Sequence, residues 1–367
     1  MEESIMKNKG FTWYVLMIGF LVISLASFST STAYAKNFRL TIGAGHPADA
    51  AIWTGMVRDF FAPEVKKRVE AKTGNKIEWV DAYSGSVAKL GGVLEAVQDG
   101  ILDVGFIVYP FEPTKLFLHN MGYYVPFGSP DVIQAAKVTQ KVHEEFPYLR
   151  EVFEKKYNQK FLGVGMISSY NLVTTFPWKD VSELKGKKLA AAGPNLPWVK
   201  AVGAVPVQSN LNEAYTSLQT GVYEGWVMNI DATVGFKLYE VAPNYAFTGF
   251  GAVPVGAIVM NLDKWNQLPK EVQDIMLQVG KEYNPAEAEA ALAKGKRGIE
   301  TMKKANVNFY EVPFEVKKNW ADMMPNIPNE KAKEADKMGM PGTQVMKAYI
   351  DGLEKEGYKF PRRWEIK

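Results

Sequence analysis

Segments with a strand-like pattern alternate with segments of helical pattern along most of this chain, and that alternation restricts the fold more than any other feature. In the first part, residues 38–45, 76–80 and 102–108 read as strands. Apolar side chains at helical spacing, such as Trp53 and Phe60, lie between them. Strands that alternate with helices form a mostly parallel sheet with helices on its faces. We therefore expect an α/β fold.

The alternation restarts near residue 160, which predicts a second α/β lobe. The strand-like segments of this part are 161–167, 172–175, 188–191, 205–207 and 225–228. A further strand at 256–261 is expected to return to the first lobe. Residues 271–305 have a helical pattern interrupted only at Pro285. Proline removes a backbone donor and clashes with the preceding turn, so a kink is expected there.

The first residues have the pattern of a secretory signal peptide. Lys7 and Lys9 precede an apolar stretch at 11–28, and the small-x-small sequence Ala33–Ala35 follows. An uncleaved membrane anchor is the alternative, because the stretch approaches the ~20 residues that a bilayer span needs. The cleavage pattern favours removal near Ala35 and a periplasmic protein. The expected organisation is a signal peptide at 1–35, a first lobe at 36–166 joined by 255–285, and a second lobe at 167–254 joined by 286–367.

Composition excludes several classes of function. The 43 basic and 40 acidic residues nearly balance, so a nucleic-acid partner is not expected. The sequence has no cysteine, which excludes disulfides, thiol nucleophiles, cysteine-ligated zinc and a lipid-modified cysteine. Its three histidines have no metal-ligand spacing, and no nucleophile elbow or phosphate loop is present. We expect neither an enzyme nor a cofactor.

In α/β sheets, ligands bind beyond the carboxyl ends of the strands. Loops 43–49, 83–87, 109–113 and 193–198 should therefore face a cleft. The candidate ligand contacts in or beside such loops are His46, Trp53, Tyr83, Tyr109, Tyr170, Asn195, Trp198, Trp226 and Asp231. Structural roles compete with binding for four of them: core packing for Trp53, helix capping for Asn195, a core or hinge position for Trp226 and a solvated turn for Asp231.

Six blocks follow one another in order through nearly all of the expected mature chain: residues 85–87, 94–104, 181–186, 212–225, 237–242 and 261–265. Together they resemble the solute receptors of tripartite ATP-independent periplasmic (TRAP) transporters, of the dicarboxylate-binding type. The resemblance implies a two-lobed periplasmic binding protein fold, type II-like, with a long helix that spans both lobes. It also implies closure on one ligand and delivery to a membrane permease, without hydrolysis.

One departure from that family concerns the ligand. The arginine that usually clamps a carboxylate falls at Ala190, a second arginine near Ser169 or Tyr170, and an expected asparagine near Met228. Three solutions remain: backbone amides at the start of the 193–198 helix, an apolar ligand held by rings, or a cation held by Asp231.

The first two solutions in combination predict a small organic acid, an aromatic or otherwise apolar monocarboxylate, with Met228 added to the candidate contacts. A cationic or polar solute bound through Asp231, or a ligand sensor for a signalling receptor, is the alternative.

Overall fold

The computed structural model describes residues 36–367, so the predicted signal peptide lies outside the described residues. One mixed sheet of nine strands runs through residues 37–367 in the order β2-β1-β3-β8-β4-β7-β5-β6, with β9 paired to β8. The strands are β1 Asn37–Ala44, β2 Lys76–Ala82, β3 Val104–Val108, β4 Gln159–Thr174, β5 Lys188–Ala191, β6 Val205–Gln208, β7 Gly225–Met228, β8 Asn244–Asn261 and β9 Asn308–Glu311.

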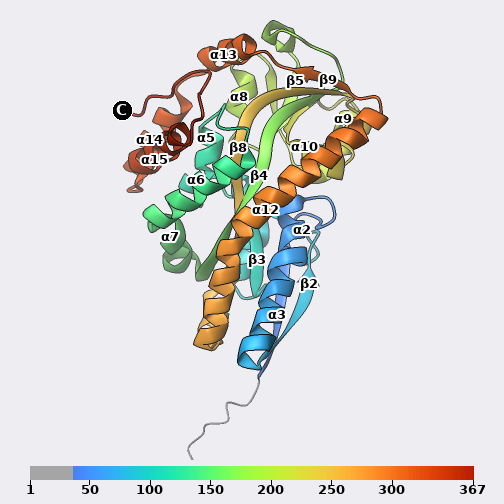
Figure 1. Ribbon diagram of the computed structural model, residues 1–367. Coiled ribbons are helices and arrows are strands. Elements are labelled where there is room, and N and C mark those ends of the chain that lie inside the picture. The colour runs from blue at the N-terminus through green and yellow to red at the C-terminus, as the bar shows by residue number, and fades with distance from the viewer. Residues whose placement is uncertain (1–35) are drawn as a thin grey trace, which may run out of the picture. The chain divides into compact units, whose positions relative to one another are not determined.

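Two long strands, β4 and β8, join the two ends of this sheet (Figure 1). The segments expected as separate strands at 161–167 and 172–175 are one strand of 16 residues, and the strand expected at 256–261 begins at Asn244 and has 18. β1, β2 and β3 form one parallel group, and β5, β6 and β7 form another. This is the two-lobed α/β architecture, in which β8 pairs with β3 of one group, β4 pairs with β7 of the other, and β4 and β8 pair with each other.

The expectation of a mostly parallel sheet was wrong at its centre. β8 pairs antiparallel with both β3 and β4, and β4 pairs antiparallel with β7. Side-chain periodicity reports which face of a strand is buried, and it carries no information on the direction of the neighbouring strand. The predicted lobe boundaries, 36–166 with 255–285 and 167–254 with 286–367, stay a prediction.

Helices cover the sheet. They are α2 Ile52–Met56, α3 Ala62–Thr73, α4 Val93–Gln98, α5 Met121–Tyr124, α6 Val132–Glu145, α7 Tyr148–Tyr157, α8 Leu196–Lys200, α9 Leu211–Gln219, α10 Ile230–Gly235, α11 Leu262–Gln267, α12 Lys270–Lys304, α13 Phe314–Met323, α14 Ile327–Lys337 and α15 Gly342–Lys355. A π-helical turn at Val57–Phe61 connects α2 to α3. Among the described residues, no helix combines the length and apolar character of a bilayer span.

The long helix α12 is confirmed, and it passes through Pro285 as one helix of 35 residues. It packs along β4, against α3 near one end of the molecule and α10 near the other (Figure 1). Helix and strand approach closely where two glycines meet. A Cβ atom on Gly163 of β4 would lie 2.3 Å from the carbonyl oxygen of Gly280, so any side chain there would push the helix away.

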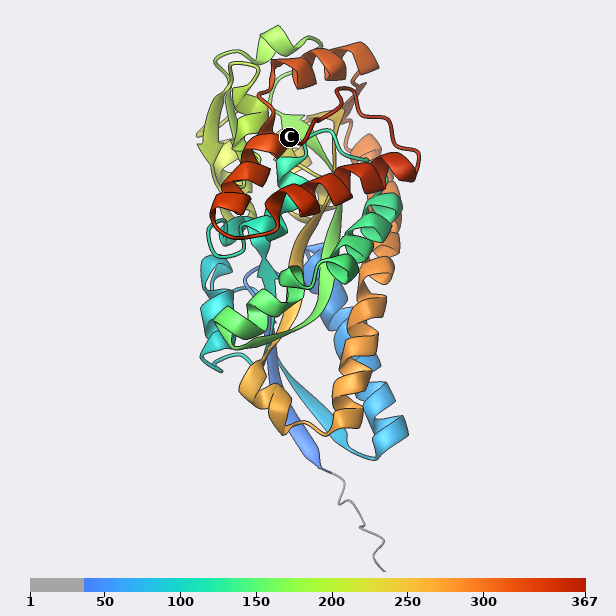
Figure 2. The ribbon, with the colours of Figure 1, turned by 90° about the vertical axis from the view of Figure 1, so that its left-hand side faces the viewer.

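The C-terminal helices lie beside α5 and α6 (Figure 2). Indole N–H groups of this part of the chain donate hydrogen bonds to backbone carbonyls far away in the sequence. Trp320 of α13 donates from Nε1 to the Trp198 carbonyl at 2.8 Å, and Trp364 donates to the Pro126 carbonyl at 2.9 Å. All three tryptophans are buried, which places these bonds where an unpaired group would be costly.

Gly163→Ala is expected to lower the free energy of unfolding by about 1–3 kcal/mol, because the added methyl group overpacks the contact of β4 with α12. Urea denaturation measures this. Gly92→Ala is the matched control, since a Cβ there has no neighbour within 4 Å, and its effect should stay within about 0.5 kcal/mol. Equal effects of the two substitutions would contradict a tight glycine contact.

Candidate functional site

A small cavity lies where the parallel strands of both groups end. His46 follows β1, Phe111 follows β3, Ala192 follows β5, Asn210 follows β6, and Met228 is the last residue of β7. All five line the cavity. Carboxyl ends of parallel strands are where α/β folds bind ligands, and here the ends of two parallel groups converge on one space.

The cavity is small. Its volume is about 20 Å³, little more than the ~10–15 Å³ that holds one water. The loop after β1 is held against the opposite side: Lys294 of α12 donates to the Ala50 carbonyl at 2.9 Å, and a Cβ on Gly235 of α10 would lie 2.2 Å from the same oxygen. An organic ligand therefore needs these surfaces to separate before it can enter.

Aromatic side chains form much of the cavity wall. Trp53, Tyr123, Tyr170 and Trp226 all line it and are at most 3% exposed. The hydroxyl groups of Tyr123 and Tyr170 are 3.2 Å apart and hydrogen-bonded. Among the described residues that line the cavity, none is arginine, lysine, aspartate or glutamate. The site offers ring surfaces and neutral polar groups.

His46 is the most polar group of this wall. Burial lowers the pKa of its imidazole to about 3, so the ring is neutral at ordinary pH. Its Nδ1 atom accepts a hydrogen bond of 3.3 Å from the Trp53 indole. Its Nε2 atom is buried without a partner, and so is the Nε1 atom of Trp226.

Helix α12 supports this wall from behind. The Tyr283 hydroxyl donates to the Trp53 carbonyl at 2.5 Å. One turn further along the same helix, Glu287 accepts from the backbone N–H of Met166 in β4 at 2.6 Å. Burial raises the pKa of the Glu287 carboxyl well above its usual range, and the nearby Asp231 adds to this shift. The long helix thus connects the cavity wall to the middle of β4.

Five of the ten predicted contacts line the cavity: His46, Trp53, Tyr170, Trp226 and Met228. The other five, Tyr83, Tyr109, Asn195, Trp198 and Asp231, do not line it. Trp198 packs in the core, where its indole donates to the Tyr123 carbonyl at 3.1 Å. Tyr109 packs its ring against His119, with centroids 5.2 Å apart. Tyr83 is half-buried, and its hydroxyl has no partner.

Asn195 and Asp231 carry the amide and the carboxyl group among those five. The Asn195 amide is fully buried with both polar atoms unpartnered, and it makes no side-chain cap on α8. Asp231 is fully buried, and its carboxyl group accepts from the Ser168 hydroxyl. Burial raises the pKa of the Asp231 carboxyl. The expectation of a solvated turn at Asp231 was wrong, because α10 packs under α12 at this point.

Sequence reasoning missed Tyr123, Asn210, Phe111 and Ala192 as cavity residues. Three of them lie within three residues of the end of a predicted strand, so the rule on strand ends would have found them. Tyr123 lies on α5, a helix of four residues, which is too short to be predicted from a periodic pattern.

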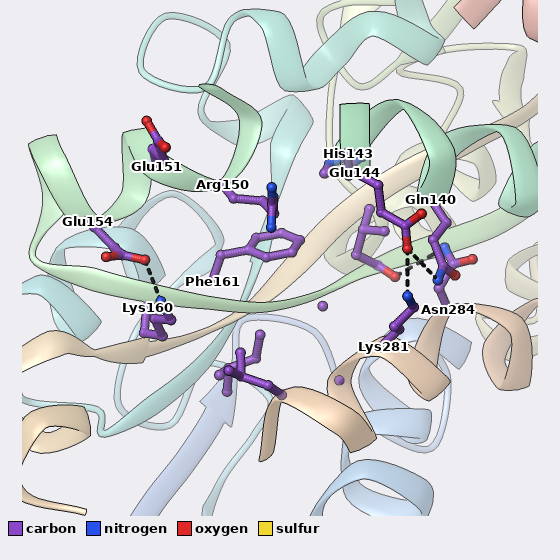
Figure 3. A pocket seen from close by; sticks show the side chains of 15 residues that line it. Gln140, His143, Glu144, Arg150, Glu151, Glu154, Lys160, Phe161, Lys281 and Asn284 are labelled. Carbon is purple, nitrogen blue, oxygen red and sulfur yellow. Dashed lines mark hydrogen bonds and ion pairs between the residues drawn. The ribbon is translucent and has the colours of Figure 1, made fainter. Parts of the chain in front are cut away.

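A larger hollow of about 540 Å³ lies on the outside of the molecule, between α6, α7, β4 and α12 (Figure 3). Four of its charged side chains pair with one another: Glu144 with Lys281 at 2.8 Å and Glu154 with Lys160 at 2.6 Å. Exposed ion pairs of this kind are ordinary surface features. The hollow has no lining residue in common with the cavity at the strand ends, which remains the candidate site.

Trp198→Ala is expected to destabilise the protein by about 3–5 kcal/mol, because it removes a fully buried ring and its bond to Tyr123. Trp198→Phe keeps most of the volume and should cost less. Urea unfolding distinguishes them. A stable Trp198→Ala protein would contradict a structural role for this ring.

Glu287→Gln should change how stability depends on pH. A buried carboxyl with a raised pKa stabilises the fold below its unfolded pKa of ~4.3, and this contribution is lost as pH rises through the folded pKa. The melting temperature of Glu287→Gln minus that of the unmodified protein should therefore increase with pH between 5 and 8. Taking the difference removes the pH dependence that comes from histidine titration, because both proteins have the same histidines. A constant or falling difference would exclude the raised pKa.

Comparisons with known proteins agree with this fold. The family model described as bacterial extracellular solute-binding protein, family 7, matches residues 58–334. The ectoine-binding periplasmic protein TeaA of Halomonas elongata is 26% identical over 269 residues, 71% of this chain and 72% of that protein.

Solved structures show the same fold. A TRAP solute-binding protein of Rhodoferax ferrireducens in complex with copurified benzoate has a TM-score of 0.74 at 14% identity, over 86% of this chain and 98% of that one. A TRAP periplasmic solute-binding protein of Bordetella bronchiseptica with bound mandelate has a TM-score of 0.73 at 19% identity, over 87% and 99%. The chain described here belongs to family 7 of the bacterial extracellular solute-binding proteins, the extracytoplasmic receptors of TRAP transporters.

Proposed function

We propose that this receptor captures a small aromatic or otherwise apolar monocarboxylate in the cavity at the strand ends and delivers it to a TRAP permease. The observation that carries the proposal is the composition of the cavity wall. Five aromatic rings besides the His46 imidazole line it, and none of its described lining residues has a charged side chain. Stripping an ion of its water costs several kcal/mol, so each further carboxylate on a ligand would add a penalty that this wall cannot offset.

The position that corresponds to the usual clamping arginine supports this reading. Ala190 is fully buried in β5, and Ala192 at the end of the same strand lines the cavity. A methyl group at the strand end leaves room for an apolar part of a ligand and provides no bidentate contact to a carboxylate. A dicarboxylate would lack the partner that the family normally provides.

Receptors of the same fold are known with ligands of the proposed class. Their solved complexes contain benzoate, 3-hydroxybenzoate or mandelate. These proteins are less than 20% identical to this chain, so they support only the ability of the fold to enclose such acids.

The mechanism proposed is closure without chemistry. The described conformation holds the loop after β1 against α10 and α12, and a ligand placed between these surfaces would contact both. A ligand stabilises the closed form by its difference in affinity for the closed and open forms, and no more. We infer that the closed, filled receptor is the form that the permease recognises, and that the protein is exported by the segment at 1–35.

The cationic alternative has less support. Asp231 does not line the cavity, its carboxyl group already accepts from Ser168, and burial favours its neutral form. A sensor for a signalling receptor would use the same cavity, and the neighbouring genes would distinguish it: a histidine kinase for sensing, membrane permease subunits for transport.

A thermal-shift panel tests the proposed ligand class. Benzoate, mandelate and cyclohexanecarboxylate should raise the melting temperature more than succinate or small amines. A ligand at 100 times its dissociation constant adds about 2.7 kcal/mol of stability. The largest shift with succinate would overturn the proposal, and shifts with amines alone would point to Asp231.

A further inference from the structure

The Trp53 indole fixes the tautomer of His46. An indole N–H can only donate, so the Nδ1 atom that it contacts at 3.3 Å must be the acceptor. In a neutral imidazole the proton then resides on Nε2. The Tyr283 hydroxyl holds the backbone of Trp53 in place at 2.5 Å, which fixes the start of α2 and the direction of its indole.

The surroundings of His46 keep its ring neutral. The rings packed against the imidazole are Trp53, Phe111 and Phe236, with centroids 5.3, 6.1 and 6.2 Å away, and none is charged. The other titratable groups that line the cavity are Tyr123 and Tyr170, whose pKa values are raised by burial. Protonation of His46 would also place a second N–H against the Trp53 indole.

Two buried N–H donors of the cavity wall therefore have no acceptor within the described protein. One is His46 Nε2 from the loop after β1, and the other is Trp226 Nε1 from β7. Both side chains are at most 2% exposed. A buried donor without an acceptor costs about 1–3 kcal/mol, so the two together favour a ligand that provides an acceptor to each.

We propose that His46 and Trp226 are the specificity-determining pair of the site: neutral donors, one from each parallel group, that hold the acid group of the ligand. This assignment rests on the proposed function. Because neither donor is charged, the pair has no counter-charge for a second carboxylate. Because they belong to opposite ends of the sheet, one acid group that binds both also favours closure.

Calorimetric titration of the purified mature protein tests the assignment, with benzoate, mandelate and cyclohexanecarboxylate as probes. For the tightest of the three, His46→Asn and Trp226→Phe should each weaken binding roughly tenfold or more, as expected for the loss of a bond to a charged group. His119→Asn and Trp265→Phe are matched controls, since both residues are buried and outside the cavity, and they should change affinity less than twofold.

The pH dependence of the unmodified protein provides a test that no substitution can disturb. With a neutral imidazole, affinity should change less than twofold between pH 8 and 5.5, where a carboxylic acid of pKa about 4 stays ionised. A tenfold rise in affinity toward pH 5.5 would show that His46 binds as a cation and would overturn the assignment. Nitrogen NMR should show Nε2 protonated and Nδ1 bare over the same range, and the opposite tautomer would also overturn it.

The two proposals fail in different ways. If the unmodified protein binds none of the three acids, both the proposed function and the assignment of the donor pair are wrong. The other outcome is that the unmodified protein binds one of them tightly, and that His46→Asn and Trp226→Phe are folded, as checked by circular dichroism, and bind it as well as the controls do. In that case only the assignment of the donor pair is wrong.

Discussion

The antiparallel pairing of β4 with β8 is the contact on which the rest of the molecule depends. β8 pairs with β3 of one parallel group and β4 pairs with β7 of the other, so the pairing of β4 with β8 joins the two groups. Helix α12 packs along β4 so closely that two glycines are needed at their crossing. The pairing is also irregular, with register shifts between Gly165 and Met166 and between Ile167 and Tyr170. Bulges of this kind bend a strand, and they lie beside the cavity, where a bend re-aims Tyr170.

The site is a consequence of that arrangement. Each parallel group ends its strands toward the shared centre, so residues at the ends of β1, β3, β5, β6 and β7 meet there, and no one segment contains the whole candidate site. The hydrogen bonds from the Tyr283 hydroxyl to the Trp53 carbonyl and from the Trp53 indole to His46 connect this centre to α12. These bonds fix the position of the His46 ring within a wall that is otherwise mostly aromatic.

Much of this could be predicted from the sequence, and the failures have physical causes. Periodicity located the strands and the long helix, and the rule on strand ends led to His46 as a candidate. Periodicity could not show that β4 and β8 are antiparallel, because strand pairing is decided by segments far apart in the chain. Trp198 resembled a site residue for a similar reason: its partners, Tyr123 and Trp320, are 75 and 122 residues away. Tyr123 was missed because a helix of four residues is too short for any period.

The small size of the central cavity has a consequence for kinetics. A receptor whose aromatic walls nearly meet must part them before each capture and again before each release, and the same barrier slows both steps. Only the fraction of molecules that is open at a given moment takes up solute, and apparent affinity falls by that fraction. Residence time, more than the speed of encounter, would then govern how such a receptor supplies its transporter.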